Sequence, residues 1–255
     1  MSYYSLHSGG VNRTQRTEFL DKVEALRCTS PRSWYTDRRH VTPRRIRLAV
    51  IVYGILALGA LLWGVLGSRP NLYHHPAPIF GLAFPMSTLV ALGSGAAVAL
   101  VVVVSTRILV RRTRWARSLH IEFRNLLGPL SSAEIAVFAL TSGIAEEMFF
   151  RGAMQPSLGL IASSVIFGLA HIGPMRRFWV WTVWATVMGL VFGLLYAATG
   201  ELLAPVVAHV LINYENMHFI ESYDPEPPRG PSEDRGLMRT SSEPRLVSTR
   251  LRPGP

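Results

Sequence analysis

The sequence is poor in cysteine and in charge, and each shortage excludes a class of protein. Cys28 is the only cysteine among 255 residues, which excludes an intrachain disulfide and any metal site built from several cysteines. Only 16% of the residues are charged, whereas 49% are hydrophobic, a balance that is unusual for a soluble protein of this length. The first 45 residues contain no apolar core run, so we expect no cleavable signal peptide.

The apolar residues are gathered in long runs, which are typical of helices that cross a membrane. We therefore predict an all-α polytopic membrane bundle of about six transmembrane helices with disordered polar termini. The expected spans are approximately 46–68, 84–106, 131–153, 160–172, 178–198 and 202–219. The expected organisation is a polar, basic N-terminal tail (1–45), two transmembrane helices with a basic loop (46–130), a four-helix core (131–220) and a C-terminal tail (221–255).

Positive charge dominates the polar segments, because 26 lysines and arginines face 16 acidic residues and the net charge is +10. In a soluble protein this excess would favour nucleic-acid binding. Here the arginines flank apolar runs, which follows the positive-inside rule. The basic connection 107–124 is therefore expected to contact anionic lipid headgroups and not nucleic acid. With six spans, the same rule places both termini in the cytoplasm. We expect the membrane to be the cell (plasma) membrane.

One apolar stretch, residues 145–152, carries an unusual group of charges and reads Ala-Glu-Glu-Met-Phe-Phe-Arg-Gly. An ionisable residue inside a membrane helix indicates a functional site. Glu147 and Arg151 are four residues apart and can pair on one helix face, whereas Glu146 is turned roughly 100° away. We therefore expect another helix to supply the partner of Glu146. Ahead of this stretch, Ser-Ser-Ala-Glu at 131–134 predicts a capping box at the start of the helix.

Three further polar residues lie in the later spans, namely His171, His209 and Asn213. His209 and Asn213 are four residues apart and share a helix face. Glu146, His171 and His209 each lie 9 to 12 residues from a turn, or roughly 14–18 Å along a helix. At that common depth near the bilayer centre they are expected to meet. Because buried polar groups are costly in lipid, their convergence indicates a functional site.

The residue types at this expected site suit hydrolysis by water. Apolar surroundings disfavour an ionised carboxylate, which makes Glu146 a competent general base. His171 is placed to share the same water, while His209 and Asn213 can donate hydrogen bonds to a developing oxyanion. Two histidines and a glutamate are also a ligand set for zinc with one open position, although the spacing is not His-Glu-x-x-His.

A stripe of small residues recurs every four positions in the span 178–198, at Ala185, Gly189, Gly193 and Ala197. Small residues allow helices to approach closely in lipid. The stripe therefore predicts close helix packing, a structural role and not a site.

These polar residues resemble the three sequence motifs of the CAAX-processing and bacteriocin-processing (CPBP) intramembrane endopeptidases. This family is also called the abortive-infection family and includes type II CAAX prenyl proteases. That family shows Glu-Glu-x-x-x-Arg, Phe-x-x-x-His and His-x-x-x-Asn/Asp on successive membrane helices; here these are 146–151, 167–171 and 209–213. The resemblance covers about residues 131–217 and implies an intramembrane protease. The catalytic residues that it implies are Glu146, Glu147, Arg151, His171, His209 and Asn213.

The resemblance also implies roles for these residues. Glu146 and His171 would activate water, His209 and Asn213 would form the oxyanion site, and Glu147 with Arg151 would support them. The use of a metal is unsettled within the family, so zinc stays an option here. The implied partners are the lipid bilayer and a protein or peptide substrate, with or without a lipid, because members process prenylated proteins or bacteriocin-like peptides.

Two other functions are compatible with the same composition. A catalytically silent membrane scaffold or partner protein could keep this fold, but the intact motifs argue against it. A proton-coupled transporter would also place ionisable residues in a membrane bundle. The sequence contains neither duplicated halves nor paired broken helices, which argues against a transporter.

Overall fold

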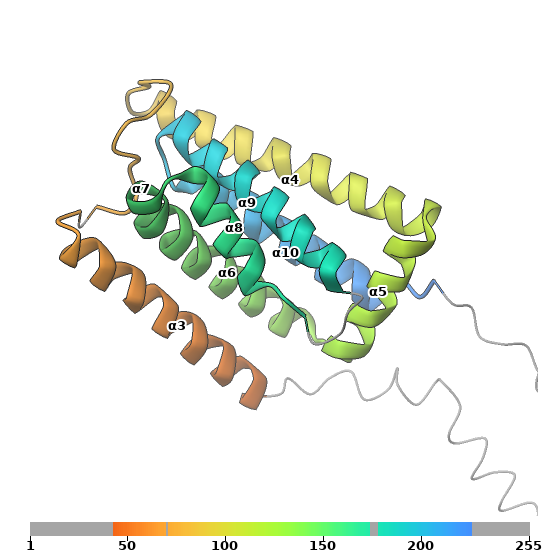
Figure 1. The fold of residues 1–255 in the computed structure, drawn as a ribbon. Coiled ribbons are helices and arrows are strands. Elements are labelled where there is room, and N and C mark those ends of the chain that lie inside the picture. The colour runs from red at the N-terminus through yellow and green to blue at the C-terminus, as the bar shows by residue number, and fades with distance from the viewer. Residues whose placement is uncertain (1–42, 70, 174–177, 226–255) are drawn as a thin grey trace, which may run out of the picture. The chain divides into compact units, whose positions relative to one another are not determined.

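The computed structural model describes residues 43–69, 71–173 and 178–225, and these residues form helices without any strand (Figure 1). The predicted all-α fold is confirmed. The tail predictions for residues 1–42 and 226–255 lie outside the described residues. The helices are α3 (Pro43–Leu66), α4 (Met86–Arg112), α5 (Arg114–Leu127), α6 (Ser132–Glu147), the π-helix η1 (Met148–Met154), α7 (Gln155–Leu158), α8 (Leu160–Ala170), α9 (Trp179–Thr199) and α10 (Leu203–Ser222).

Several helices have the length and composition of membrane spans, which confirms an integral membrane protein of polytopic type. In the described part, α3, α4 and α9 qualify individually, and the bent pair formed by α5 and residues 132–158 brings the number to at most four. We predicted about six. The difference lies in α8, which has 11 residues, and in α6 and α10, whose apolar runs are interrupted by polar residues. The helices that carry the predicted site are thus the short or polar ones.

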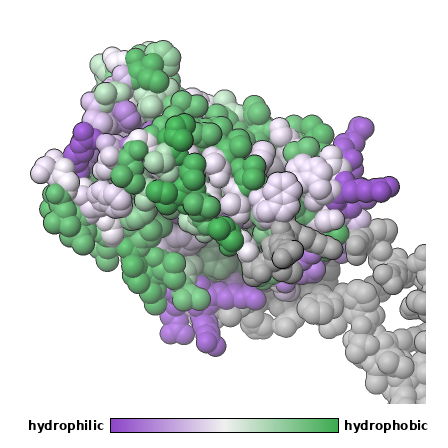
Figure 2. Space-filling view, viewed as in Figure 1, coloured by the Kyte–Doolittle hydropathy of each residue, from purple (hydrophilic) through white to green (hydrophobic). Residues whose placement is uncertain are grey.

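The helices pack so that α6 lies in the interior of the bundle. α6 contacts α3 on one side and α10 on another, α10 packs along α4, and α8 packs along α9 (Figure 1). The outer faces are apolar, and large side chains such as Leu58, Val101 and Leu169 are more than half exposed. Figure 2 shows apolar side chains spread over one face of the molecule. Such a surface is suited to contact with lipid chains.

The predicted capping box at the start of α6 is confirmed. The Ser131 hydroxyl oxygen accepts a hydrogen bond from the Glu134 amide at 3.2 Å, and the Glu134 carboxylate accepts one from the Ser131 amide at 2.9 Å. These bonds satisfy two backbone donors that a helix start leaves unpaired. The first residue of α6, and with it the depth of the glutamates, is therefore set by local sequence.

Residues 67–85 form a connection that packs on one end of the bundle. The Tyr196 hydroxyl donates to the carbonyl of buried Leu72 at 3.1 Å, and the His75 amide donates to the Gly200 carbonyl at 2.9 Å. Partial burial lowers the pKa of the His75 imidazole. Gly200 turns from α9 into α10 at a φ of 77°, a conformation that glycine adopts without strain. This connection fixes the spacing between α3, α9 and α10.

The basic connection 107–124, predicted as a loop, is instead the end of α4 followed by the amphipathic helix α5. One face of α5 buries Ala116 and His120, while Arg114, Trp115 and Arg117 are exposed. Arginine and tryptophan on the exposed face of such a helix are typical of the membrane interface. The loop prediction was wrong because no apolar run marks this helix; its signal is the helical spacing of its few apolar residues.

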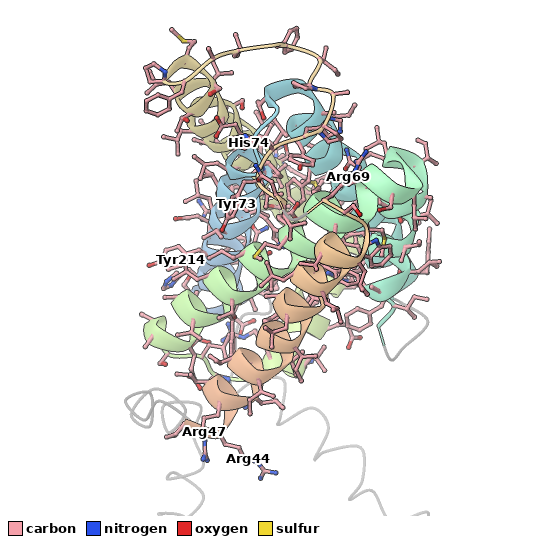
Figure 3. The ribbon with its side chains drawn as sticks, turned by 90° about the vertical axis from the view of Figure 1, so that its left-hand side faces the viewer. Arg44, Arg47, Arg69, Tyr73, His74 and Tyr214 are labelled. Atoms are coloured by element: carbon pink, nitrogen blue, oxygen red, sulfur yellow. The ribbon has the colours of Figure 1, made fainter. Side chains whose placement is uncertain are left out.

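The arginines of α3 lie at the same end of the bundle as α5. The Arg45 guanidinium donates to the carbonyls of Leu127, the last residue of α5, and Pro129, two residues beyond it. Figure 3 shows Arg44 and Arg47 at this end, whereas Arg69 and His74 lie toward the other. The two ends of the bundle thus differ in charge, as a fixed orientation in the membrane requires.

Close packing of α6 against α10 depends on Gly143. A Cβ atom added at Gly143 would lie 2.6 Å from Cγ2 and 3.1 Å from the backbone nitrogen of Val210, whereas one added at Gly93 would meet nothing within 4 Å. We expect Gly143→Ala to lower the free energy of unfolding by about 1–3 kcal/mol through overpacking. The matched control Gly93→Ala should leave stability unchanged or slightly higher. Thermal unfolding in detergent measures both, and equal Tm values would contradict this account.

Candidate active site

The Glu-Glu-x-x-x-Arg motif spans two kinds of helix. Glu146 and Glu147 are the last residues of α6, and Arg151 lies in the π-helix η1. π-helical turns are rare and occur often at functional sites. The predicted pair is present, because Arg151 Nη1 donates to Glu147 Oε1 at 2.9 Å. The sequence indicated the pair but not the wider turn that carries its arginine.

Glu147 joins three helices through one carboxylate oxygen. Oε1 accepts from Arg151 and also from His209 Nδ1 on α10, at 2.7 Å. Glu147 is 0%, Arg151 1% and His209 5% exposed. A buried charge is tolerated only where it is paired and hydrogen-bonded. Glu147, expected mainly to support the site through Arg151, therefore also fixes the orientation of His209.

Arg151 is held by α9 and by aromatic rings as well as by Glu147. Its Nη2 donates to the Gly189 carbonyl at 3.2 Å, and its guanidinium carbon lies 4.2 Å from the centre of the Phe167 ring. A guanidinium over an aromatic face is stabilised by the ring quadrupole. The phenylalanine of the Phe-x-x-x-His motif thus packs on the arginine of the first motif.

The small residues of α9 have a second role besides close packing. The side-chain amide of Gln155 donates to the Gly193 carbonyl at 3.0 Å, four residues beyond the Gly189 carbonyl that accepts from Arg151. A Cβ atom at Gly193 would lie 2.6 Å from Gln155 Oε1. The prediction of close packing is confirmed, and the same glycines expose backbone acceptors to the helix that carries the motif.

The partner of Glu146 from another helix is His171. His171 follows the last residue of α8, and its Nε2 lies 3.5 Å from Glu146 Oε2. Its Nδ1 lies 2.7 Å from the Phe167 carbonyl. A carbonyl only accepts, so Nδ1 carries the proton and Nε2 of the neutral ring presents its lone pair to Glu146. The two groups face each other at a separation longer than a direct hydrogen bond.

Asn213 of α10 is hydrogen-bonded to Ser142 of α6. Asn213 Nδ2 donates to the Ser142 hydroxyl oxygen at 3.0 Å, and that hydroxyl donates to the Phe138 carbonyl at 2.7 Å. One N–H of the amide is used in this contact, and the second N–H and the carbonyl oxygen stay available for other partners. Ser142 lies four residues before Glu146 on the same helix.

The polar residues come together, as predicted from their common depth. They do so as two pairs and not as one group around Glu146. Glu146 meets His171, while His209 meets Glu147. Among the residues that the structure describes, Oε2 of Glu146 and Oε2 of Glu147 are buried without a hydrogen-bond partner. Such acceptors are expected to bind water or a substrate group.

One residue of the cluster was missed by the sequence reasoning. The hydroxyl of Tyr53 of α3 lies beside the side chains of Glu146 and Ser142. It lies in the most apolar part of the chain and far from the motifs in sequence. The only sequence signal is a single polar hydroxyl inside a predicted span, which is weak because tyrosine is common in membrane helices.

The ligand set considered for zinc does not come together as a three-residue group. Within residues 43–69, 71–173 and 178–225, no three histidine, cysteine, aspartate or glutamate side chains are arranged to hold a metal ion. Both histidines carry their Nδ1 proton toward an acceptor, which is the usual orientation of a metal-binding imidazole. Their carboxylate neighbours, however, divide them into two separate pairs.

Two Arg–Glu pairs that differ in exposure allow a matched test of burial. Arg151→Ala leaves Glu147 as a partly compensated charge in an apolar interior, so we expect a loss of roughly 3–5 kcal/mol in stability. The pair of Arg107 and Glu215 is 35% and 44% exposed, and Arg107→Ala should change stability by about 1 kcal/mol or less. Unfolding in detergent and the folded yield measure both effects. Equal losses would show that burial of the Glu147 pair is not what makes it important.

Comparison with known proteins gives a match that covers the motif region. Residues 129–214 match the family model described as type II CAAX prenyl endopeptidase Rce1-like. The chain is 32% identical over 90 residues to the "Uncharacterized protein YpbD" of Bacillus subtilis (strain 168), a match that covers 35% of this chain and 47% of that relative. The chain thus spans about half the length of this curated relative. No solved structure matches it.

The matched segment contains all six predicted site residues, whereas α3, α4 and α5 precede it. The buried arrangement of the three motifs and the family match point to the same group of proteins. The resemblance indicated by the motifs is therefore confirmed, since residues 129–214 match the family model described as type II CAAX prenyl endopeptidase Rce1-like.

Proposed function

We propose that this protein is an intramembrane endopeptidase that hydrolyses a peptide bond of a membrane-associated protein or peptide. The observation that carries this proposal is the pair formed by Glu146 and His171. Their facing atoms are 3.5 Å apart, and Glu146 Oε2 is buried without a hydrogen-bond partner among the described residues. A carboxylate oxygen and an imidazole lone pair that face each other in a largely buried site can both accept from one water molecule.

Glu146 is the general base in this proposal. It removes a proton from water as the water oxygen bonds to the carbonyl carbon of the substrate, and the C–N bond breaks when that proton reaches the leaving amine. His171 orients the water, because its Nδ1 proton is held by the Phe167 carbonyl and only Nε2 can accept. Glu147 cannot take the same role while its Oε1 accepts from Arg151 and His209.

Asn213 and His209 stabilise the oxyanion in the proposed mechanism. Asn213 has one amide N–H bonded to Ser142 and a second one for the substrate oxygen. His209 donates Nδ1–H to Glu147, so its Nε2 becomes a donor when the ring is doubly protonated.

The substrate class follows from the membrane setting. The polar cluster lies inside a bundle whose outer faces are apolar, so a substrate that already associates with the bilayer reaches it most readily. A lipid attached to the substrate, as in prenylated proteins, would serve that purpose. We infer no nucleic-acid partner, because the exposed arginines of α5 lie beside Trp115 in an amphipathic helix. No metal is assigned a role.

We expect substitutions in the proposed site to reduce turnover more than binding. Glu146→Gln keeps the size of the side chain but cannot take a proton, so kcat should fall by about 10²–10⁴-fold. His209→Ala and Asn213→Ala should each cost about 10²–10³-fold through loss of an oxyanion donor. Cleavage of a membrane-anchored peptide library by purified protein in lipid measures these effects.

The control is Glu215→Gln, which alters an exposed carboxylate of the same chain outside the cluster. This variant should retain wild-type turnover. An active Glu146→Gln variant would overturn the proposed mechanism, and retained activity in all three site variants would make the cluster structural.

The proposed orientation places both termini and α5 on the cytoplasmic side of the cell membrane. Position 118 of α5 and position 77 of the 67–85 connection are both exposed. In a Cys28→Ser background, a cysteine at Ser118 should react with an impermeant maleimide only from the cytoplasmic side, and one at Ala77 only from the opposite side. The reversed pattern, or labelling of both from one side, would show that the orientation is wrong.

A further inference from the structure

Helix α3 runs in register beside α6, and this register brings Tyr53 to the level of the glutamates. Near its start, Arg45 donates to the Pro129 carbonyl, and near its end Trp63 Nε1 donates to the Ser157 hydroxyl oxygen at 3.2 Å. Tyr53 lies 8 residues after Arg45 and 10 before Trp63. Between these two contacts, a Cβ atom added at Gly59 would lie 3.7 Å from the Phe149 ring. Six residues back along both helices lead from there to Tyr53 and to residue 143, between Ser142 and Glu146.

The face of α3 that carries Tyr53 is the face that packs in the bundle. Tyr53, Ala57, Ala60 and Gly64 follow each other at helical spacing, and their burial increases from half-buried Tyr53 to fully buried Ala60. Ala60 packs with Ala153, which lies seven residues beyond Glu146. The position of Tyr53 on the buried face is therefore independent of its hydrogen bonds.

The hydroxyl of Tyr53 connects the two parts of the proposed site. Its side-chain partners are Glu146 and Ser142, and Ser142 accepts a hydrogen bond from Asn213. Glu146 Oε2 has no hydrogen-bond partner within the described part of the chain, which leaves Oε1 as the oxygen that a bond from the phenol would reach. Oε2 of the same carboxylate faces His171.

We infer that Tyr53 is a positioning residue for the general base Glu146. A phenol donates to a carboxylate and cannot replace it as a base. The bond fixes the rotation of the carboxyl group, so that Oε2 points to the water held with His171. This inference rests on the proposed function. It also brings α3, which lies outside residues 129–214, into the active site.

The hydrogen bond should also change the pH range in which the enzyme works. A donor bonded to the ionised form of a carboxylate stabilises that form. The other titratable groups around Glu146 are His171 of α8, the adjacent Glu147, and Arg151 of η1, while His209 acts on it through Glu147. Removing only the Tyr53 hydroxyl leaves all of these groups in place.

The test compares Tyr53→Phe with Tyr73→Phe in the cleavage assay. Tyr53→Phe keeps the ring and should lower kcat by roughly 10- to 100-fold, the range for a hydrogen bond to a charged group. KM should change little, and the acid limb of the kcat/KM profile should move to higher pH. The side chain of Tyr73 is 64% exposed in the 67–85 connection (Figure 3), so its variant should match wild type in all three readouts.

A double variant separates positioning from a general structural role. If Tyr53 acts through Glu146, adding Tyr53→Phe to Glu146→Gln should not lower residual cleavage further. Wild-type kcat and an unmoved acid limb in Tyr53→Phe, or an additive loss in the double variant, would overturn the inference while leaving the proposed function intact. Failure of the wild-type protein to cleave, or an active Glu146→Gln variant, would instead overturn the proposed function and the inference with it.

Discussion

The buried carboxylate of Glu147 is the constraint on which the rest of the structure depends. It is 0% exposed in an apolar bundle, where an unpaired charge would be prohibitively costly. Its two partners come from different elements, Arg151 from η1 and His209 from α10. Arg151 in turn requires the Gly189 carbonyl and the Phe167 ring. The need to supply hydrogen-bond partners to the Glu147 carboxylate and to its partner Arg151 therefore determines how η1, α8, α9 and α10 approach each other.

Small residues make this convergence sterically possible. Gly143 allows α10 to approach α6, and Gly189 and Gly193 allow the side chains of η1 and α7 to reach the backbone of α9. In lipid, helices gain little from hydrophobic association, so close packing and interhelical hydrogen bonds drive assembly. In this bundle the two contributions coincide, since the glycines that permit contact also expose the carbonyl acceptors.

Much of this arrangement could be predicted because it follows from local rules. The capping box at Ser131 and Glu134, the pairing of Glu147 with Arg151, and the need for a partner of Glu146 from another helix all depend on sequence spacing. The choice of partner for His209 could not be predicted, because adjacent glutamates differ only in the direction in which they point. The π-helix, the helix α5 and the contact of Tyr53 with Glu146 arise from packing between distant segments, which spacing within one segment does not encode.

The difference between the two adjacent glutamates explains why the motif needs both. Successive residues of a helix point roughly 100° apart, so Glu146 and Glu147 cannot share the same surroundings. Glu147 points to Arg151 and His209, which both donate to its carboxylate. Glu146 points to α3 and α8, where it meets a hydroxyl and an imidazole but no guanidinium hydrogen bond. A carboxylate that is held by neutral groups keeps its capacity to accept a proton, whereas one bonded to a guanidinium is stabilised as the anion and loses it. One helix turn thereby supplies both the charge that orders the bundle and the base that the proposed reaction requires.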